Sequence, residues 1–342
     1  MRIGLFLLTV VLVVIAASAF FSVSHNQSAV ADQHQILKTV ADVPLSGPAV
    51  RFDYQSLDPT DGRLYIAHMN ADQLVVFDTN KREVVATLDG FHRVHGVIAV
   101  PEIDRIFASI TGDHHVGIVD RSSLKMLAPA GDINYPDGLA YAPSVHRVFV
   151  SDEHGNVDVV IDAKTNSKVT AIPLGGGAGN TVYDSVGDRI LVAVHGKNEL
   201  VTIDPRNARI EERIALPALD NPHGIVLDPE NHLAFVAGEG NHKLVVVDLN
   251  SRQVSAPYDV GKDPDVLAFD NSAKRLYVAA ESGHVTVFQE ANRTLQLLGE
   301  LHMPHAHTVA VGQKTHLVYF PLENLNGKPV LRVMEFAGPA AQ

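Results

Sequence analysis

The sequence has no cysteine and no tryptophan, and only 19% of its 342 residues are charged. Without cysteine, disulfides and thiolate-ligated zinc or iron–sulfur sites are excluded. Bases are outnumbered by acids, 27 to 39, which gives a formal net charge of −12. Nucleic-acid binding needs a concentrated positive surface and aromatic platforms for stacking. The composition therefore argues against nucleic acid as a partner. What the chain does have in quantity is histidine, with 18 residues.

The N-terminus carries a targeting pattern. Arg2 is followed by an apolar run from Ile3 to Phe21 and then by a polar stretch, a layout typical of a secretory signal. We expect residues 1–31 to be a signal peptide and residues 32–342 to form one periplasmic or secreted domain. The run is also long enough to span a bilayer, so an uncleaved membrane anchor is the alternative. In both cases the domain works outside the cytoplasm.

A short motif of one basic residue followed by apolar residues recurs at intervals of 42 residues in its first four copies and of 41 to 43 residues thereafter. Its copies begin at Arg63, Arg105, Arg147, Arg189, His232, Arg275 and His316. Each copy holds four short alternating segments separated by turn residues, which indicates four strands. No long amphipathic helix interrupts them. The pattern predicts an all-β protein, a seven-bladed β-propeller with four antiparallel strands per blade.

The period also predicts the limits of the blades. They are expected at residues 52–91, 92–132, 133–175, 176–219, 220–261, 262–303 and 304–338. The last copy has only three strands of its own, whereas residues 36–45 match the fourth-strand pattern of Glu83–Leu88. We therefore expect this N-terminal strand to complete the last blade, which hides the strand edges that an open ring would expose.

The third copy shows a family resemblance. Its segments Pro136–Pro143, Arg147–Ser151 and Gly155–Asn166 resemble the repeat of YVTN/YncE-like propellers, which are related to the haem-binding propeller of periplasmic nitrite reductase. The resemblance extends over roughly Ile36 to Gly338. It implies the fold but no single activity, because such propellers include ligand binders, cofactor-handling proteins, scaffolds and enzymes.

One residue heads the innermost strand of each expected blade, at one face of the channel that we name the top face. Counting in steps of 42 or 43 gives Asp53, His95, Asp137, Asn180, His223, Asp265 and His307. Polar residues at these positions are also what a water-filled channel would have without any ligand. Imidazoles and carboxylates, however, are the groups that bind metals and transfer protons.

The three ring histidines are spaced as nearly threefold as seven blades allow. We expect His95, His223 and His307 to meet near the axis and bind a transition metal, either zinc, copper or iron, or a metallocofactor. Neighbouring carboxylates would hold their far ring nitrogens. Further ligand or cofactor contacts are expected from two ring residues and from histidines in the second-to-third strand loops: Asp53, Asn180, His68, His115, His154, His195 and His242.

Three functions remain open from the sequence. The first is a binding module that holds a small ligand, a metal or a metallocofactor at the top face and can pass it to a partner protein. The second is a metal-dependent lyase or hydrolase with Asp137 or Asp265 as general base. The third is a protein-interaction scaffold without a small ligand. We expect a monomer in each case.

Overall fold

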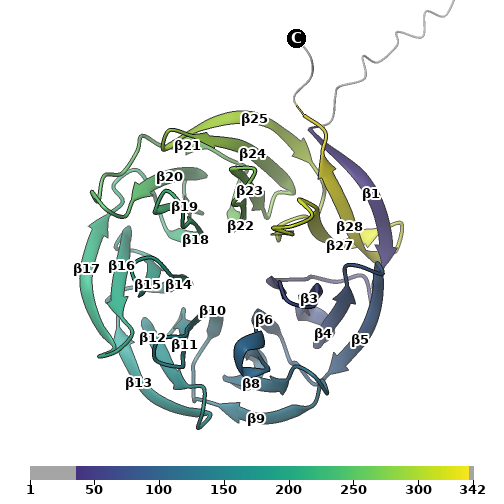
Figure 1. Ribbon diagram of the computed structural model, residues 1–342, viewed down its shortest axis with the longest axis horizontal. Coiled ribbons are helices and arrows are strands. Elements are labelled where there is room, and N and C mark those ends of the chain that lie inside the picture. Colours follow the sequence, from purple (N-terminus) through teal and green to yellow (C-terminus); the bar gives the residue numbers. More distant parts are fainter. Residues whose placement is uncertain (1–35, 339–342) are drawn as a thin grey trace, which may run out of the picture. The chain divides into compact units, whose positions relative to one another are not determined.

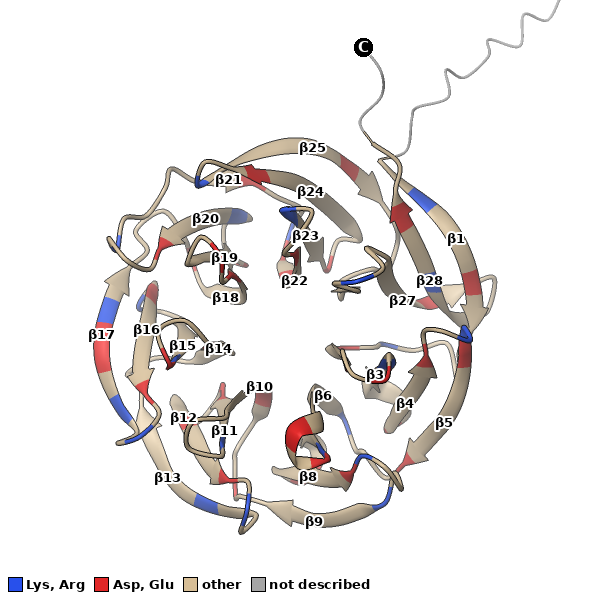
Figure 2. Cartoon of the chain, viewed as in Figure 1, with Lys and Arg blue, Asp and Glu red and all other residues tan. Residues whose placement is uncertain are grey.

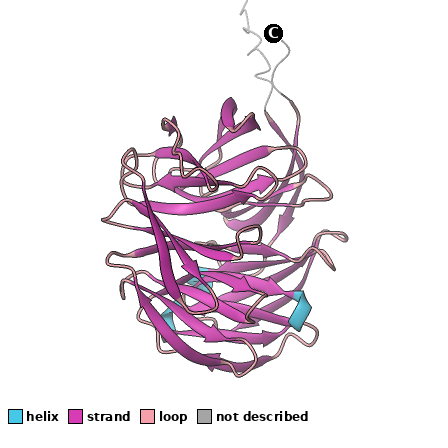
Figure 3. Ribbon diagram, turned by 60° about the vertical axis from the view of Figure 1, so that its left-hand side comes forward, coloured by secondary structure: helices cyan, strands magenta, loops and turns pink. Residues whose placement is uncertain are grey.

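The computed structural model describes residues 36–338, so the expected signal peptide lies outside the described residues. Seven antiparallel sheets of four strands stand in a ring around a common axis (Figure 1). The all-β seven-bladed propeller expected from the repeats is thus confirmed. Among the described residues, helical structure is confined to three 3₁₀ turns, Met69–Ala71, Pro101–Ile103 and Thr111–Asp113 (Figure 3). Within residues 36–338, no helix has the length and apolar character that crossing a membrane requires.

The strands of the first four blades follow one another along the chain, from the axis outward. Blade 1 contains β2 (Gln55–Leu57), β3 (Arg63–His68), β4 (Gln73–Asp78) and β5 (Glu83–Asp89). Blade 2 contains β6 (Val94–Val100), β7 (Arg105–Ile110), β8 (His115–Asp120) and β9 (Met126–Ala130). Blade 3 contains β10 (Pro136–Ala142), β11 (Arg147–Asp152), β12 (Val157–Asp162) and β13 (Ser167–Pro173). Blade 4 contains β14 (Ala178–Asp184), β15 (Arg189–Val194), β16 (Glu199–Asp204) and β17 (Arg209–Ala215).

The remaining three blades include the one that closes the ring. Blade 5 contains β18 (Pro222–Asp228), β19 (Leu233–Gly238), β20 (Lys243–Asp248) and β21 (Tyr258–Asp259). Blade 6 contains β22 (Pro264–Asp270), β23 (Arg275–Ala280), β24 (His284–Ala291) and β25 (Thr294–His302). Blade 7 contains β26 (Ala310–Val311), β27 (Val318–Leu325), β28 (Lys328–Phe336) and β1 (Leu37–Pro44).

The N-terminal strand closes the ring as expected. β1 is the outer strand of blade 7 and pairs antiparallel with β28, from Leu37 opposite Phe336 to Pro44 opposite Val330. One irregularity in register falls between Thr39 and Ala41. Leu37 is fully buried in the apolar cluster between blades 6 and 7. Closure therefore combines backbone pairing with burial of side chains.

The hydrophobic core lies between the blades. Each of the seven apolar clusters in the described chain joins two neighbouring blades; Phe107 of blade 2, for example, belongs to one cluster with Val148 and Val150 of blade 3. Middle strands have a sheet on both faces, so their residues read as continuous apolar runs rather than alternating ones. In β11 the run from Val148 to Val150 is completely buried.

Three of the recurring arginines link neighbouring blades by hydrogen bonds. Arg63 of blade 1 donates to the carbonyl of Arg121 in blade 2, at 3.2 Å. Arg147 of blade 3 donates to the carbonyl of Pro205 in blade 4, at 2.9 Å, and Arg189 of blade 4 reaches the carbonyl of Leu249 in blade 5, at 3.2 Å. The 42-residue motif thus marks an architectural contact and not a ligand site.

The closure can be tested with a matched pair of leucines on outer strands. Replacing Leu37 of β1 by alanine should lower the free energy of unfolding by about 2–5 kcal/mol, because a fully buried side chain is lost. Leu297→Ala on β25 is the control, since Leu297 is 54% exposed and should change stability by less than about 0.5 kcal/mol. Chemical denaturation measures both. Equal stabilities of the two variants would contradict the role of β1.

Candidate functional site

The top-face residues are presented by bulges at the start of the inner strands. In blade 3, Asp137 and Gly138 of β10 together oppose the single residue Ser151 of β11. The same irregularity occurs at the start of β6, β14, β18 and β22. A bulge of this kind twists a strand locally and re-aims its side chains, and bulges are common beside functional sites.

The register corrects one residue of the expected ring. Ala178 opposes Val194 in blade 4 just as Pro136 opposes Asp152 in blade 3, so Gly179 and not Asn180 holds the ring position. Asn180 lies one residue further on, and its Oδ1 accepts a hydrogen bond from the backbone N–H of Thr181 at 2.8 Å. Blade 4 therefore contributes no ring side chain.

The space left by Gly179 is used by a loop histidine. A Cβ at position 179 would lie 3.0 Å from Nε2 of His195, which follows β15 in the same blade. It would also lie 3.0 Å from the Cα of His223. The glycine therefore allows His195 to approach the neighbouring ring residue His223.

A small cavity of about 140 Å³ lies at this end of the axis. Six of its lining residues are acids, and the others are two histidines, two tyrosines and one arginine: Asp53, Asp137, Glu153, Glu239, Asp265, Glu281, His95, His223, Tyr54, Tyr135 and Arg51. Figure 2 shows that basic positions also lie on outer strands such as β13 and β17, far from this cavity. The cavity volume is well below the roughly 300–1,000 Å³ of sites for drug-sized ligands.

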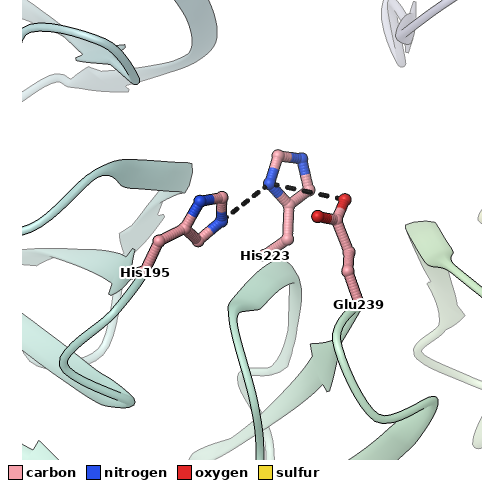
Figure 4. Close-up of side chains that lie close together, drawn as sticks. All are labelled: His195, His223 and Glu239. Atoms are coloured by element: carbon pink, nitrogen blue, oxygen red, sulfur yellow. Dashed lines mark hydrogen bonds and ion pairs between the residues drawn. The ribbon is translucent and has the colours of Figure 1, made fainter.

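His223 stands at the centre of one group of possible metal ligands. Its Nδ1 lies 3.2 Å from Nε2 of His195 and 3.8 Å from Oε1 of Glu239 (Figure 4). One ligand atom from each of the three residues lies within 4.8 Å of the others. The far nitrogen of His223 faces the hydroxyl of Tyr54 at 3.0 Å and Oδ1 of Asp265 at 3.6 Å.

The two imidazoles of this group differ in protonation. Burial alone would lower the pKa of His223, but the carboxylates of Glu239, Asp265 and Asp137 outweigh burial and raise it to about 9. Burial and the neighbouring charge of His223 lower the pKa of His195 to about 4. At neutral pH, His223 is thus protonated and donates through Nδ1 to the lone pair of neutral His195.

A second group contains His307, Asp265 and Glu281. Nδ1 of His307 lies 3.0 Å from Oδ2 of Asp265 and 3.7 Å from Oε1 of Glu281. This group already holds a cation, because the guanidinium of Arg51 lies 2.6 Å from Oε1 of Glu281 and 3.9 Å from Oδ2 of Asp265. Burial opposes charge on His307, yet the hydrogen bond to Asp265 raises its pKa.

His95 forms a third arrangement on the cavity wall. Its Nδ1 donates to the carbonyl of Arg93 at 2.8 Å, which leaves Nε2 as an acceptor for the Tyr135 hydroxyl at 3.1 Å. Oδ2 of Asp53 lies 3.9 Å from the same Nε2. Burial is the main cause that lowers the pKa of His95 to about 4, and burial raises the pKa of Asp53 to about 7.

The three ring histidines do not meet at one point, contrary to our expectation. Within residues 36–338, His223 shares ligand-like spacing with His195 and Glu239, whereas His307 shares it with Asp265 and Glu281. His95 belongs to neither group. Each imidazole has a different set of partners, so the three histidines do not form one ligand group.

The other loop histidines lie apart from the cavity. His68 is fully buried, and its ring stacks on Phe52 with centroids 4.0 Å apart, so it does not face the top surface. His115 bonds to the carbonyl of Asp113, and exposed His154 packs on the ring of Tyr135. Nδ1 of His242 accepts from the backbone N–H of Asp263. Among the expected cofactor contacts, only Asp53 and His195 adjoin the cavity or its ligand group.

Six cavity residues were absent from the expected set. Glu153, Glu239 and Glu281 follow the second strands of their blades, and the other three are Arg51, Tyr54 and Tyr135. A signal for them existed in the sequence. Arg51 and Tyr135 both stand two residues before a ring position, and Tyr54 directly follows one. The 42-residue count therefore also identifies a second tier of residues around the axis.

The charge balance around His223 can be tested by NMR titration. In the metal-free protein, Glu239→Gln should lower the pKa of His223, because the carboxylate favours the imidazolium. Protonated His223 stabilises the fold fully below the unfolded pKa of about 6.5, and this contribution is lost as the pH rises through about 9. Long-range ¹H–¹⁵N spectra report the titration, with Glu102→Gln as a control outside the cavity. An unchanged pKa in Glu239→Gln would refute the coupling.

Comparisons with known proteins agree with this architecture. The chain matches no protein-family profile. It is 22% identical over 192 residues to "Uncharacterized protein YncE" of Salmonella typhimurium and to the protein of the same description from Salmonella typhi, a stretch covering 54% of this chain. The matched stretch spans about half, 53%, of these curated relatives.

Solved structures show the same fold. "Kuenenia stuttgartiensis Hydrazine Synthase" superposes with a TM-score of 0.72 at 16% identity, covering 87% of this chain and 97% of that one. "Streptogramin B lyase structure" gives 0.71 at 14% identity, covering 87% and 96%. At such identities the likeness is one of fold alone. The chain is therefore a seven-bladed β-propeller that is similar in sequence to YncE.

Proposed function

We propose that the protein binds a transition-metal ion at the top face through His195, His223 and Glu239. The observation that carries this is the spacing of the three ligand atoms. Four ligands at about 2.0–2.1 Å from a tetrahedral zinc ion stand about 3.3–3.4 Å apart. The separations of 3.2 Å between the imidazoles and 3.8 Å from Nδ1 of His223 to Glu239 bracket that value. Two imidazoles favour zinc, copper or iron over magnesium or calcium.

The surroundings support a cation at this group and not at the second one. Glu153 lies 3.9 Å from Nδ1 of His195, and Tyr54 holds the far nitrogen of His223, so both rings have partners on the side away from the site. In the second group the positive charge is the permanent guanidinium of Arg51, whereas in the first it is a proton on Nδ1 of His223 that a binding metal ion would displace. The cavity beside Glu239 leaves room for water or a small ligand as a fourth partner.

A metal-dependent lyase or hydrolase is the second candidate. Asp137 favours it, since its Oδ1 is buried without a hydrogen-bond partner and its Oδ2 lies 3.9 Å from Nε2 of His223. A metal ion at His223 would polarise a substrate, and Asp137 would take a proton from that substrate or return it. Asp265 suits the role less, because its carboxylate is paired with His307. A solved propeller of the same fold is titled as a lyase.

Location outside the cytoplasm is part of the proposal. It rests on the apolar run Ile3–Phe21 after Arg2. A partner that receives or delivers the metal would approach the top face, where the loops that carry His195 and Glu239 lie.

Metal analysis of the protein purified without an affinity tag tests the proposal. Supplied with zinc and dialysed, the wild type should retain one ion per chain. His195→Ala and His223→Ala should each weaken zinc binding by at least about tenfold, because each removes a ligand. His302→Ala is the matched control, since His302 is exposed on β25 and belongs to neither group.

The outcomes separate the alternatives. Zinc retention that is equal in all four proteins would refute the site and return the chain to a scaffold role. Loss of zinc in both site variants, together with turnover of an added ester or lactone that Asp137→Asn abolishes, would favour the enzyme. Loss of zinc without turnover supports the binding module.

A further inference from the structure

The opposite end of the axis holds a second and larger cavity, of about 580 Å³. It is lined by the far ends of the inner strands and the turns that follow them, Asp58–Gly62 and Gly312–Thr315. The inner strands run from the top-face residues toward these turns. The cavity therefore lies on the face away from the metal group, and it stands independently of the proposed function.

The cavity lies beside the junction at which the ring closes. β2 spans three residues and β26 two, whereas β10, β18 and β22 span seven each. These two short strands are neighbours, because blade 7 meets blade 1 where the ring closes.

The inner walls are apolar and come from four blades. They include Leu57 of blade 1, Val226 of blade 5, Phe269 of blade 6 and Val309 of blade 7. Leu57 and Val226 are only partly buried, so their side chains are accessible. The cavity at the upper end of the same axis is lined by six acids. Because of this contrast, the two cavities do not suit the same class of ligand.

The polar groups at the rim are mostly satisfied by one another. Arg121 pairs with Asp58 at 2.9 Å and with Asp61 at 2.7 Å. Thr79 donates to the carbonyl of Gly62 at 2.6 Å, and Gln313 donates to the carbonyl of Phe269 at 2.7 Å. These groups have little capacity left to recognise a polar ligand. What remains is apolar surface, the unpartnered Oε1 of Gln55 and one charge.

The charge belongs to Lys314, which is exposed at the rim. Its ammonium has no ion-pair partner within the described part of the chain, whereas the nearby carboxylates Asp58 and Asp61 are paired with Arg121. A ligand with one anionic group would complement this lysine. The cavity volume falls in the roughly 300–1,000 Å³ range of small-molecule sites.

We infer that this cavity binds a small amphipathic anion of the medium-chain carboxylate class. The apolar body lies along Leu57, Val226 and Phe269, and the carboxylate lies at Lys314. Burial of the chain against these walls supplies most of the affinity, and the lysine selects the anion over a neutral molecule of the same length.

Fluorescence titration of the full chain with 8-anilinonaphthalene-1-sulfonate, followed by displacement with decanoate, tests this. Binding should saturate at one probe per chain. Leu57→Gln and Val226→Gln should each weaken it by about tenfold, because each puts an amide on the apolar wall. Val186→Gln is the matched control, since Val186 is 56% exposed and does not line the cavity.

Lys314→Ala provides a variant whose fold is not at risk, because the side chain is exposed. It should weaken decanoate by about threefold to fivefold and leave decanol unchanged. Displacement by decanol as strong as by decanoate in the wild type would overturn the anion assignment. Probe binding that does not saturate, or that is equal in Leu57→Gln, Val226→Gln and Val186→Gln, would overturn the site itself.

Discussion

Face-to-face packing of neighbouring blades is the constraint on which the rest of the structure depends. Each sheet is apolar on both faces, and each apolar cluster of the described chain belongs to two blades. A single blade would leave one face in water, so only a closed ring buries them all. The axis, by contrast, carries the starts of the inner strands with their polar side chains. Stability and chemistry are thus placed in different parts of each repeat.

The architecture could be predicted from the sequence because every blade buries apolar residues at the same positions of its repeat. That requirement gives the 42-residue period, the number of blades and the unpaired fourth strand at residues 36–45. Counting failed only at Asn180, after the glycine-rich connection Gly175–Gly179. A shift of one residue in a loop leaves the hydrophobic pattern unchanged, yet it decides which side chain stands at a bulge. Backbone pairing alone identified Gly179 as the ring residue.

The groupings at the top face could not be predicted in the same way. Tyr54 and His223 bond across 169 residues of sequence, and Arg51 meets Glu281 from another blade. Such contacts depend on the width of the ring and on the reach of each side chain, which no period encodes. The expectation that three histidines converge assumed a channel narrow enough for their side chains to meet at the axis. Instead the top face holds two groups of possible metal ligands. In one, the guanidinium of Arg51 balances the carboxylates of Asp265 and Glu281. In the other, the imidazoles of His195 and His223 share a proton.

The pairing of β1 with β28 also bears on how the molecule is made. Leu37 and Phe336 are opposite each other, although almost the entire described chain separates them. Contacts of such long sequence separation slow folding, because the entropy cost of closing a large loop comes before the contacts can stabilise the fold. During synthesis the early blades can assemble one after another, but β1 has no strand to pair with until β28 has been made. The earliest strand of the propeller is therefore the last to find its place.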